Sequence, residues 1–368
     1  MPADNAVNGN PSCANEWLLK DVARDEWGFD GCKPHAAGPP FSFSQSSRRT
    51  HARLLCAKTD ITSDCGAEND VISSHHFADP VQGVKDILNA GTDVDCGGMM
   101  GGNAMKALNA SAITEADIDE RLKMLFRVRL RLGHFDPVGP LQSFPVSDVC
   151  SAEHIALSMD GMAQSAAMLK NDANTLPLSK SDSFAVIGPN ANMSKTDVSY
   201  YGPSKPCGSK YWTLTDAVGK FGSTVRSHLG IPAVDSEDTS GIADAVEVAA
   251  AADKVVLALG VDLSWAHEGH DSTTLEIPAA QMQLVEQTTA AAKAPVVVVV
   301  FCANPLDISA LLKNPKIGAV MHVGQPSTTI YGLAEVLFGM ISPAGRTIQT
   351  IYPASYADEI SIFDFNMR

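Results

Sequence analysis

Four continuous apolar runs in the second half of the chain limit its fold more than any other feature. They are rich in Val and Ile and lie at residues 183–189, 254–260, 295–301 and 316–324. Apolar runs without polar alternation are typical of strands that are buried on both faces of a parallel sheet. Stretches with helical spacing fall between and after them, at residues 243–252, 279–293, 307–313 and 330–339. We therefore predict an α/β fold in which helices cover both faces of a mostly parallel sheet.

A long polar loop, residues 261–278, follows the second of these predicted strands. Ligands of open α/β sheets bind outside the carboxyl ends of the strands, so this loop is a candidate functional segment. It contains His-Glu-Gly-His-Asp, but the zinc motif HExxH requires a longer spacing, on a helix. A solvated polar loop is the simpler interpretation of this sequence, and a positioned acid at Glu268 is the sharper one.

The first half of the chain is less regular. Gly91 is placed to end one predicted helix, and Thr114 with Asp117 resembles a capping box at the start of the next. Residues 134–148 carry three prolines and are predicted to form a linker. The predicted helices of this half and of the entry to the second domain span residues 15–27, 79–91, 113–133 and 154–172.

Composition excludes several classes of function. The formal net charge of −15 disfavours binding to nucleic acid and to anionic membrane surfaces. The longest apolar run, residues 294–303, is too short to span a bilayer. The N-terminus has neither the basic head nor the apolar core of a signal peptide. The eight cysteines include no CxxC pair and are too few for a disulfide scaffold.

Asp64 stands where a predicted strand, ending at residues 61–62, breaks into a turn. Taken alone, this carboxylate either caps the next element or is aimed at a substrate. His75 and His76 with Asp79 could be metal ligands, but such residues are more often solvated. The glycines of residues 97–102 lack the Lys-Ser/Thr ending of a phosphate loop, so we predict a flexible turn there.

A series of motifs runs along nearly the whole chain: NAVNG, EWGFDG, ITSDCGA, AGTDVDCG, RLRLGHFDP, MLKNDANTLPL, VIGPNA, GVDLSWAHEGHD and AGRTIQTIYP. In these motifs and their order the chain resembles glycoside hydrolase family 3, and it is most similar to the β-xylosidase and α-L-arabinofuranosidase branch. Cys rather than Trp after Asp64 favours this branch over the β-glucosidases.

The resemblance implies roles for individual residues. Asp64 would be the catalytic nucleophile at the end of a barrel strand, and Glu268 the acid/base from a loop of the second domain. Cys65, Cys96 and His267 are assigned to the substrate-binding residues. The two cysteines could also bridge in an oxidising compartment, or remain buried thiols. No metal and no organic cofactor is implied.

The resemblance also implies a domain organisation. Residues 1–135 would be the C-terminal remnant of a TIM-barrel catalytic domain, a partial barrel because the family has about six further strand–helix units before its NAVNG motif. Residues 32–60 interrupt this remnant as an atypical insertion, and we interpret them as an unremoved non-coding segment or an error in the gene model. A linker (136–150), an α/β sandwich domain (151–358) and a C-terminal tail (359–368) would follow.

The implied activity is the retaining hydrolysis of non-reducing terminal β-D-xylosyl or α-L-arabinosyl residues from xylan-derived oligosaccharides, as part of xylan catabolism. One alternative is a catalytically inactive, truncated pseudoenzyme or carbohydrate-binding remnant. Within enzymes, the alternative is a β-glucosidase. Xylo-oligosaccharides are the expected partners, and kinship implies an extracellular, secreted protein although this chain has no signal peptide. The sequence does not indicate an oligomeric state.

Overall fold

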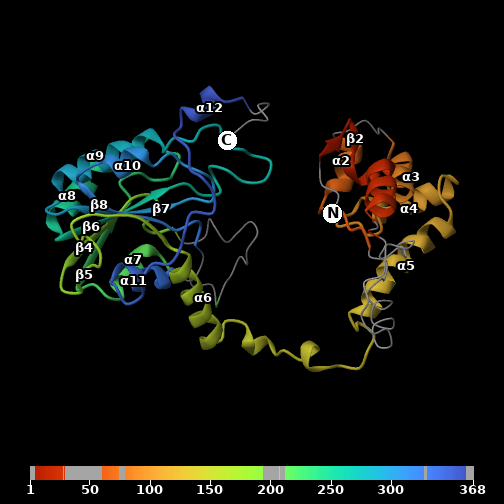
Figure 1. The fold of residues 1–368 in the computed structure, drawn as a ribbon, viewed down its shortest axis with the longest axis horizontal. Helices are drawn as coiled ribbons and strands as arrows, with labels where there is room; N and C mark the ends of the chain where they lie inside the picture. Colours follow the sequence, from red (N-terminus) through yellow and green to blue (C-terminus); the bar gives the residue numbers. More distant parts are fainter. Residues whose placement is uncertain are drawn as a thin grey trace, which may run out of the picture. The chain divides into compact units, whose positions relative to one another are not determined.

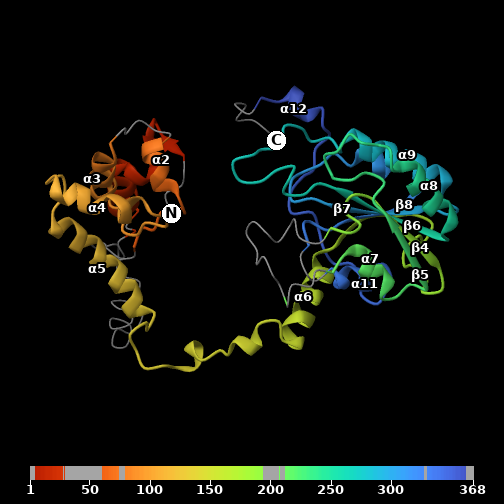
Figure 2. The same ribbon diagram turned by 180° about the vertical axis from the view of Figure 1, so that it is seen from behind.

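A computed structural model describes residues 5–27, 29, 60–73, 79–193, 207, 212–326 and 330–361. The chain divides into two compact units, Met1–Ser143 and Phe144–Arg368. The predicted insertion lies outside the described residues except for its last residue, Asp60, and so do the candidate ligands His75 and His76. Figures 1 and 2 show the two units from opposite sides.

The second unit is built on a six-stranded sheet with the order β3-β8-β7-β6-β4-β5. All neighbouring strands in it are parallel except β3, which pairs with β8 in the antiparallel sense at one edge. The α/β fold class is thereby confirmed. The four predicted strands are β4 (Ser183–Ile187), β6 (Lys254–Gly260), β7 (Val296–Phe301) and β8 (Ile317–His322).

Alternate side chains of the central strands enter two separate cores. Val256 and Val299 pack on one face with helices α6 (Ala152–Ser165), α7 (Leu214–Gly219) and α11 (Tyr331–Leu337). Leu257 and Val298 pack on the other with α8 (Ile242–Ala251), α9 (Ala279–Ala291) and α10 (Ser309–Lys313). The helices lie on the two sides of the sheet in Figure 1. Each such side chain contributes about 1.5–3 kcal/mol by burial, which explains the unbroken apolar runs.

The two edge strands, β3 (Ala167–Asn171) and β5 (Thr224–His228), were not predicted. The helix predicted over residues 154–172 is wrong in its last third, because α6 ends at Ser165 and the chain turns into β3. Extended Ala166 makes this turn, and β3 then pairs with β8 through Ala167 and His322. The remaining elements of this unit are η4 (Val146–Asp148) and α12 (Tyr356–Glu359).

The first unit packs its helices around an apolar core that includes Val71, Val84, Ile87 and Met99. Its strand-like features are a short hairpin and an isolated parallel bridge between Thr62 and Val94. Its elements are β1 (Ala6–Val7), β2 (Asn10–Pro11), η1 (Ser12–Ala14), the π-helix η2 (Trp17–Glu26), α2 (Ala67–Ser73), α3 (Pro80–Ala90), α4 (Met99–Asn109), α5 (Glu115–Arg131) and η3 (Pro140–Gln142).

Two predicted helix ends are confirmed in this unit. Gly91 ends α3 with φ +101°, and Thr114 and Asp117 form both bonds of a capping box on α5. The flexible turn predicted for the glycines of residues 97–102 is wrong. Gly98 is the N-cap of α4, which begins at Met99 and includes the later glycines, because burial of Met99 and Ala107 outweighs the low helix propensity of glycine.

Candidate active site

Asp64 lies where the chain leaves an extended segment and enters α2. The Ser63 N–H donates to Val94 O at 3.0 Å, beside the parallel bridge of Thr62 with Val94. The Cys65 N–H donates to Asp64 Oδ1 at 2.7 Å. Gly66, with φ +94°, turns the chain toward the helix in a conformation that favours glycine. The half-buried Asp64 carboxylate is therefore held at the end of a strand-like segment, the position predicted from the sequence.

A second loop, after Val94, is joined to this turn. A disulfide links Cys65 and Cys96, whose Cα atoms are 4.4 Å apart, which decides between the two states left open by the sequence. The Gly66 N–H donates to Cys96 O at 2.8 Å, and the Cys96 N–H donates to Ser63 Oγ at 3.0 Å. We call residues 63–66 the Asp64 turn. The structure brings Asp64, Cys65 and Cys96 together at this turn.

The base of the Asp64 turn is held by an ion-pair cluster that the sequence analysis missed. The fully buried Asp93 carboxylate accepts from Arg24 at 2.6 Å and from Arg121 at 2.7 Å. It also accepts from the Ile61 N–H at 2.8 Å. Burial raises the pKa of Asp93, whereas the Ile61 donor and the two guanidinium groups oppose that shift. Asp93 thereby ties η2 and α5 to the segment that leads into Asp64.

Glu268 lies in the other unit, in the loop between β6 and α9. His267 and His270 exchange two backbone hydrogen bonds, of 3.0 and 2.9 Å, so residues 267–270 form a tight turn. Gly269 makes this turn possible with φ +76°, and Glu268 is exposed at its tip. We call residues 267–270 the Glu268 turn. His267 is thus the sequence neighbour of Glu268 in a shared turn.

The rest of this loop is anchored by side chains. Trp265 Nε1 donates to Ser272 Oγ at 2.9 Å, which closes the loop around the Glu268 turn. At the end of β6, the buried Gln281 side chain accepts from the Gly260 N–H at 2.9 Å and donates to Gly260 O at 2.7 Å. Asp64 and Glu268 thus belong to different units of the chain.

A cavity of about 290 Å³ beyond β7 and β8 offers a different kind of chemistry. It is lined by Cys302 and His322, whose Sγ and Nε2 atoms are 3.2 Å apart. Burial raises the pKa of the Cys302 thiol to about 12 and lowers the pKa of His322. Both groups are therefore neutral near pH 7, and a neutral thiol is a poor nucleophile. This cavity does not provide a Cys–His catalytic pair.

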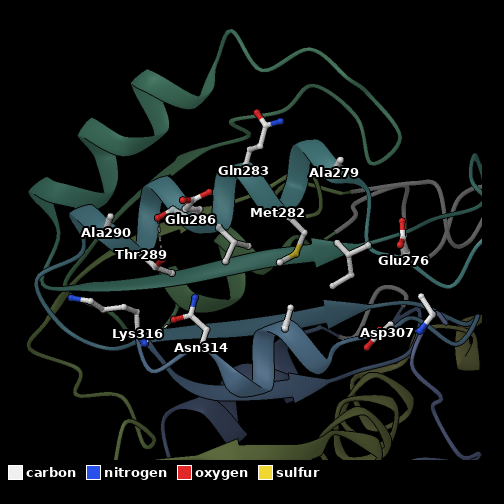
Figure 3. A pocket seen from close by; sticks show the side chains of 14 residues that line it. Glu276, Ala279, Met282, Gln283, Glu286, Thr289, Ala290, Asp307, Asn314 and Lys316 are labelled. Carbon is white, nitrogen blue, oxygen red and sulfur yellow. Dashed lines mark hydrogen bonds between the residues drawn. The ribbon is translucent and has the colours of Figure 1, made fainter. Parts of the chain in front are cut away.

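A groove of about 770 Å³ lies between α9 and α10, and its side chains are shown in Figure 3. Glu286 and Thr289 line its α9 side, and Asn314 and Lys316 line the opposite side. None of the candidate catalytic residues borders this groove. It is therefore a surface separate from the Glu268 turn.

In the described part of the chain, the His, Cys, Asp and Glu side chains include no group of three or more that could hold a metal ion. Within the same residues, no helix combines the length and the apolar character that crossing a membrane requires.

Comparisons with known proteins relate both units to one family. Residues 166–364 match the glycosyl hydrolase family 3 C-terminal domain. A probable β-D-xylosidase 7 of Arabidopsis thaliana is 36% identical over 100% of this chain and 45% of its own length. A probable exo-1,4-β-xylosidase of Neosartorya fischeri is 34% identical over 100% of the chain and 44% of its own length. The chain thus spans less than half the length of these relatives.

Solved structures give a consistent result. A family 3 exo-β-xylosidase, XlnD, in complex with a xylobiose aziridine activity-based probe matches 99% of this chain and 44% of its own. The TM-score is 0.81 and the sequence identity 30%. A β-glucosidase from Listeria innocua in complex with isofagomine matches 92% of this chain and 43% of its own, with a TM-score of 0.71 and 23% identity, which is a likeness of fold alone.

Proposed function

The chain belongs to glycosyl hydrolase family 3, and on that premise we propose that it derives from an exo-acting β-xylosidase that uses Asp64 and Glu268. The proposed reaction removes non-reducing terminal β-D-xylosyl residues, or α-L-arabinosyl residues, from xylan-derived oligosaccharides. The proposed organisation is a barrel remnant at residues 1–135, a linker at 136–150, a sandwich at 151–358 and a tail at 359–368.

One observation carries the proposal: the similarity to β-xylosidases runs through both units. The Arabidopsis relative matches 100% of the chain and the solved exo-xylosidase 99% of it. The Asp64 turn and the Glu268 turn are therefore both inside the matched region. The likeness to β-glucosidases, at 23% identity, is weaker support for glucoside hydrolysis.

The proposed chemistry is a double displacement. Asp64 attacks the anomeric carbon and forms a bond to it while the bond to the leaving oxygen breaks, and Glu268 gives its proton to that oxygen. Glu268 then takes a proton from water, which attacks the same carbon and releases Asp64. This mechanism requires the two carboxyl groups to lie about 5–5.5 Å apart across the sugar.

The proposed compartment is extracellular. Disulfides persist in oxidising environments and are rare in the cytosol. The described residues contain two, Cys65–Cys96 in the first unit and Cys150–Cys207 in the second. The second of these disulfides was not predicted from the sequence. Both support secretion.

Hydrolysis of nitrophenyl β-D-xyloside by the full chain tests the proposal, with nitrophenyl β-D-glucoside as the competing substrate. We expect the xyloside to be preferred and Asp64→Asn to abolish turnover, because the amide cannot form the covalent intermediate. Asp70→Asn, a change of the same chemistry on α2, is the matched control and should retain activity. A folded chain that turns over neither substrate would favour the inactive remnant, and a preference for glucoside would favour a β-glucosidase.

A further inference from the structure

A second carboxyl group lies buried beside the Asp64 turn, four residues further along the chain. Glu68 is 0% exposed, in the first turn of α2. Among the described residues, neither of its side-chain oxygens has a hydrogen-bond partner in good geometry. A buried carboxylate without partners is costly, and such groups normally become neutral by binding a proton.

Asp95, from the loop that carries Cys96, provides the complementary acceptor. Its Oδ2 accepts from the Met100 N–H at 2.8 Å, at the start of α4. Its Oδ1 is buried and has no hydrogen-bond partner among the described residues. The Glu68 side chain interacts with that of Asp95. Asp95 Oδ1 is therefore an acceptor to which a protonated Glu68 can donate.

The described residues around Glu68 supply little other charge. The helices and turn packed around α2 contribute apolar core side chains, among them Val84 of α3 and Met99 of α4, together with the buried Cys13 of η1. Titratable groups on the same segment are Asp64 and Asp70, and both are less buried than Glu68.

Burial raises the pKa of Glu68 to about 7. The nearby Ser63 hydroxyl opposes this shift, and the negative charge of Asp95 adds to it. A proton held between Glu68 and Asp95 gives the unpartnered Oδ1 atom of Asp95 a donor.

We propose that Glu68 and Asp95 share one buried proton, and that this proton holds the Asp64 turn in place. Glu68 is then a positioning residue that acts through the turn. Asp95 and Ser63 provide the connection, because Asp95 adjoins Cys96, and the Cys96 N–H donates to Ser63 Oγ at 3.0 Å. Loss of the proton leaves two buried anions that repel each other and separates α2 from the loop of Cys96.

The direction of the pH dependence follows from the raised pKa. The proton is retained in the folded state up to about pH 7, whereas an unfolded glutamate loses it near its ordinary value. The stability contributed by the protonated pair is therefore fully present below the unfolded pKa, and it is lost as the pH rises through the folded pKa. Any effect of the shared proton on catalysis rests on the proposed function, whereas the existence of the shared proton does not depend on it.

The test combines infrared spectroscopy with hydrogen exchange on the full chain, and neither needs a substrate. We expect a protonated-carboxyl band that disappears as the pH passes about 7, and that is absent in Glu68→Gln. The amide that this substitution introduces would itself donate to Asp95 without titrating. Glu26→Gln, at an exposed glutamate of the same unit, is the matched control and should leave the band unchanged.

Hydrogen exchange of the α2 amides gives the size of the effect. In the wild-type chain, the protection of the α2 amides, corrected for the intrinsic exchange rate, should fall on the order of 50-fold between about pH 5 and about pH 8. Linkage requires a change of this size for the difference between the folded and unfolded pKa of Glu68. Protection in Glu68→Gln should stay constant over that range.

Absence of the band, or α2 protection that does not depend on pH in the unchanged chain, would overturn the proposal. Protection that rises with Ca²⁺ instead of with protons would also overturn it, because the pair would then be a cation site. If Glu68→Gln does not fold, the infrared titration of the unchanged chain still decides. Where the chain hydrolyses xyloside, kcat should fall more steeply above about pH 7 in the wild-type chain than in Glu68→Gln, while KM stays unchanged.

Discussion

The two candidate catalytic carboxylates are supported in different ways. The Asp64 turn is held by a disulfide, by backbone hydrogen bonds to the loop of Cys96 and by the ion pairs of Asp93. The Glu268 turn is held by two backbone hydrogen bonds between histidines, and Glu268 is exposed at its tip.

This difference suits the two proposed roles. A nucleophile must approach the anomeric carbon along one line, so rigid support of Asp64 lowers the cost of reaching that geometry. An acid/base on a loop can follow the leaving group and later the water. We therefore expect changes around Asp64 to alter stability and activity together, and changes around Glu268 to alter activity alone.

Asp93→Asn should have the largest effect on stability. It removes the buried carboxylate that both Arg24 and Arg121 contact, and breaking a buried ion pair typically costs about 3–5 kcal/mol. Chemical denaturation should show the loss in the first unit, with the sandwich transition unchanged. A loss below about 1 kcal/mol would mean that water reaches the cluster and that the Asp64 turn is less rigidly supported.

Replacing Cys65 and Cys96 by serine should have the next largest effect. The disulfide closes a segment of 31 residues, and its loss should cost about 2–4 kcal/mol. Replacement of Cys150 and Cys207 is the matched control, because it removes a disulfide from the other unit. Hydrogen exchange near Asp64 should rise only in the first variant, and an equal rise in both would remove the distinction between the two turns.

Gly269→Ala should have the smallest effect. No atom of the described residues lies within 4 Å of the added methyl group, so the cost is that of φ +76° alone, about 1–2 kcal/mol. We expect kcat for xyloside to fall, while the free energy of unfolding falls by no more than this amount. A larger loss of stability would show that the Glu268 turn is part of the structural core.

The sequence was most informative where one physical effect dominates. Burial on both faces of a sheet produces unbroken apolar runs, so the strands ending at Ile187 and Phe301 could be predicted. Edge strands lack this signal: β5, with Arg226 and Ser227 in its five residues, resembles a loop. The capping box at Thr114 was predictable because it is local in sequence.

The candidate site was predicted in part for the same reason. Asp64 and Glu268 were recognised by their resemblance to family motifs, and their meeting stays a proposal. The cluster of Asp93 with Arg24 and Arg121 was missed because its members are 69 and 28 residues apart and no local pattern joins them. The burial of Glu68 depends on how α2 packs, which a single carboxylate in a sequence does not reveal.

The most direct test of the two-carboxylate mechanism is covalent labelling of the full chain with a xylobiose aziridine probe, followed by mass spectrometry of its peptides. We expect one adduct, on the peptide that contains Asp64, lost in Asp64→Asn and formed on the order of 100-fold more slowly in Glu268→Gln, because ring opening needs an acid. A folded chain that stays unlabelled, or an adduct on another carboxylate, would contradict the assignment.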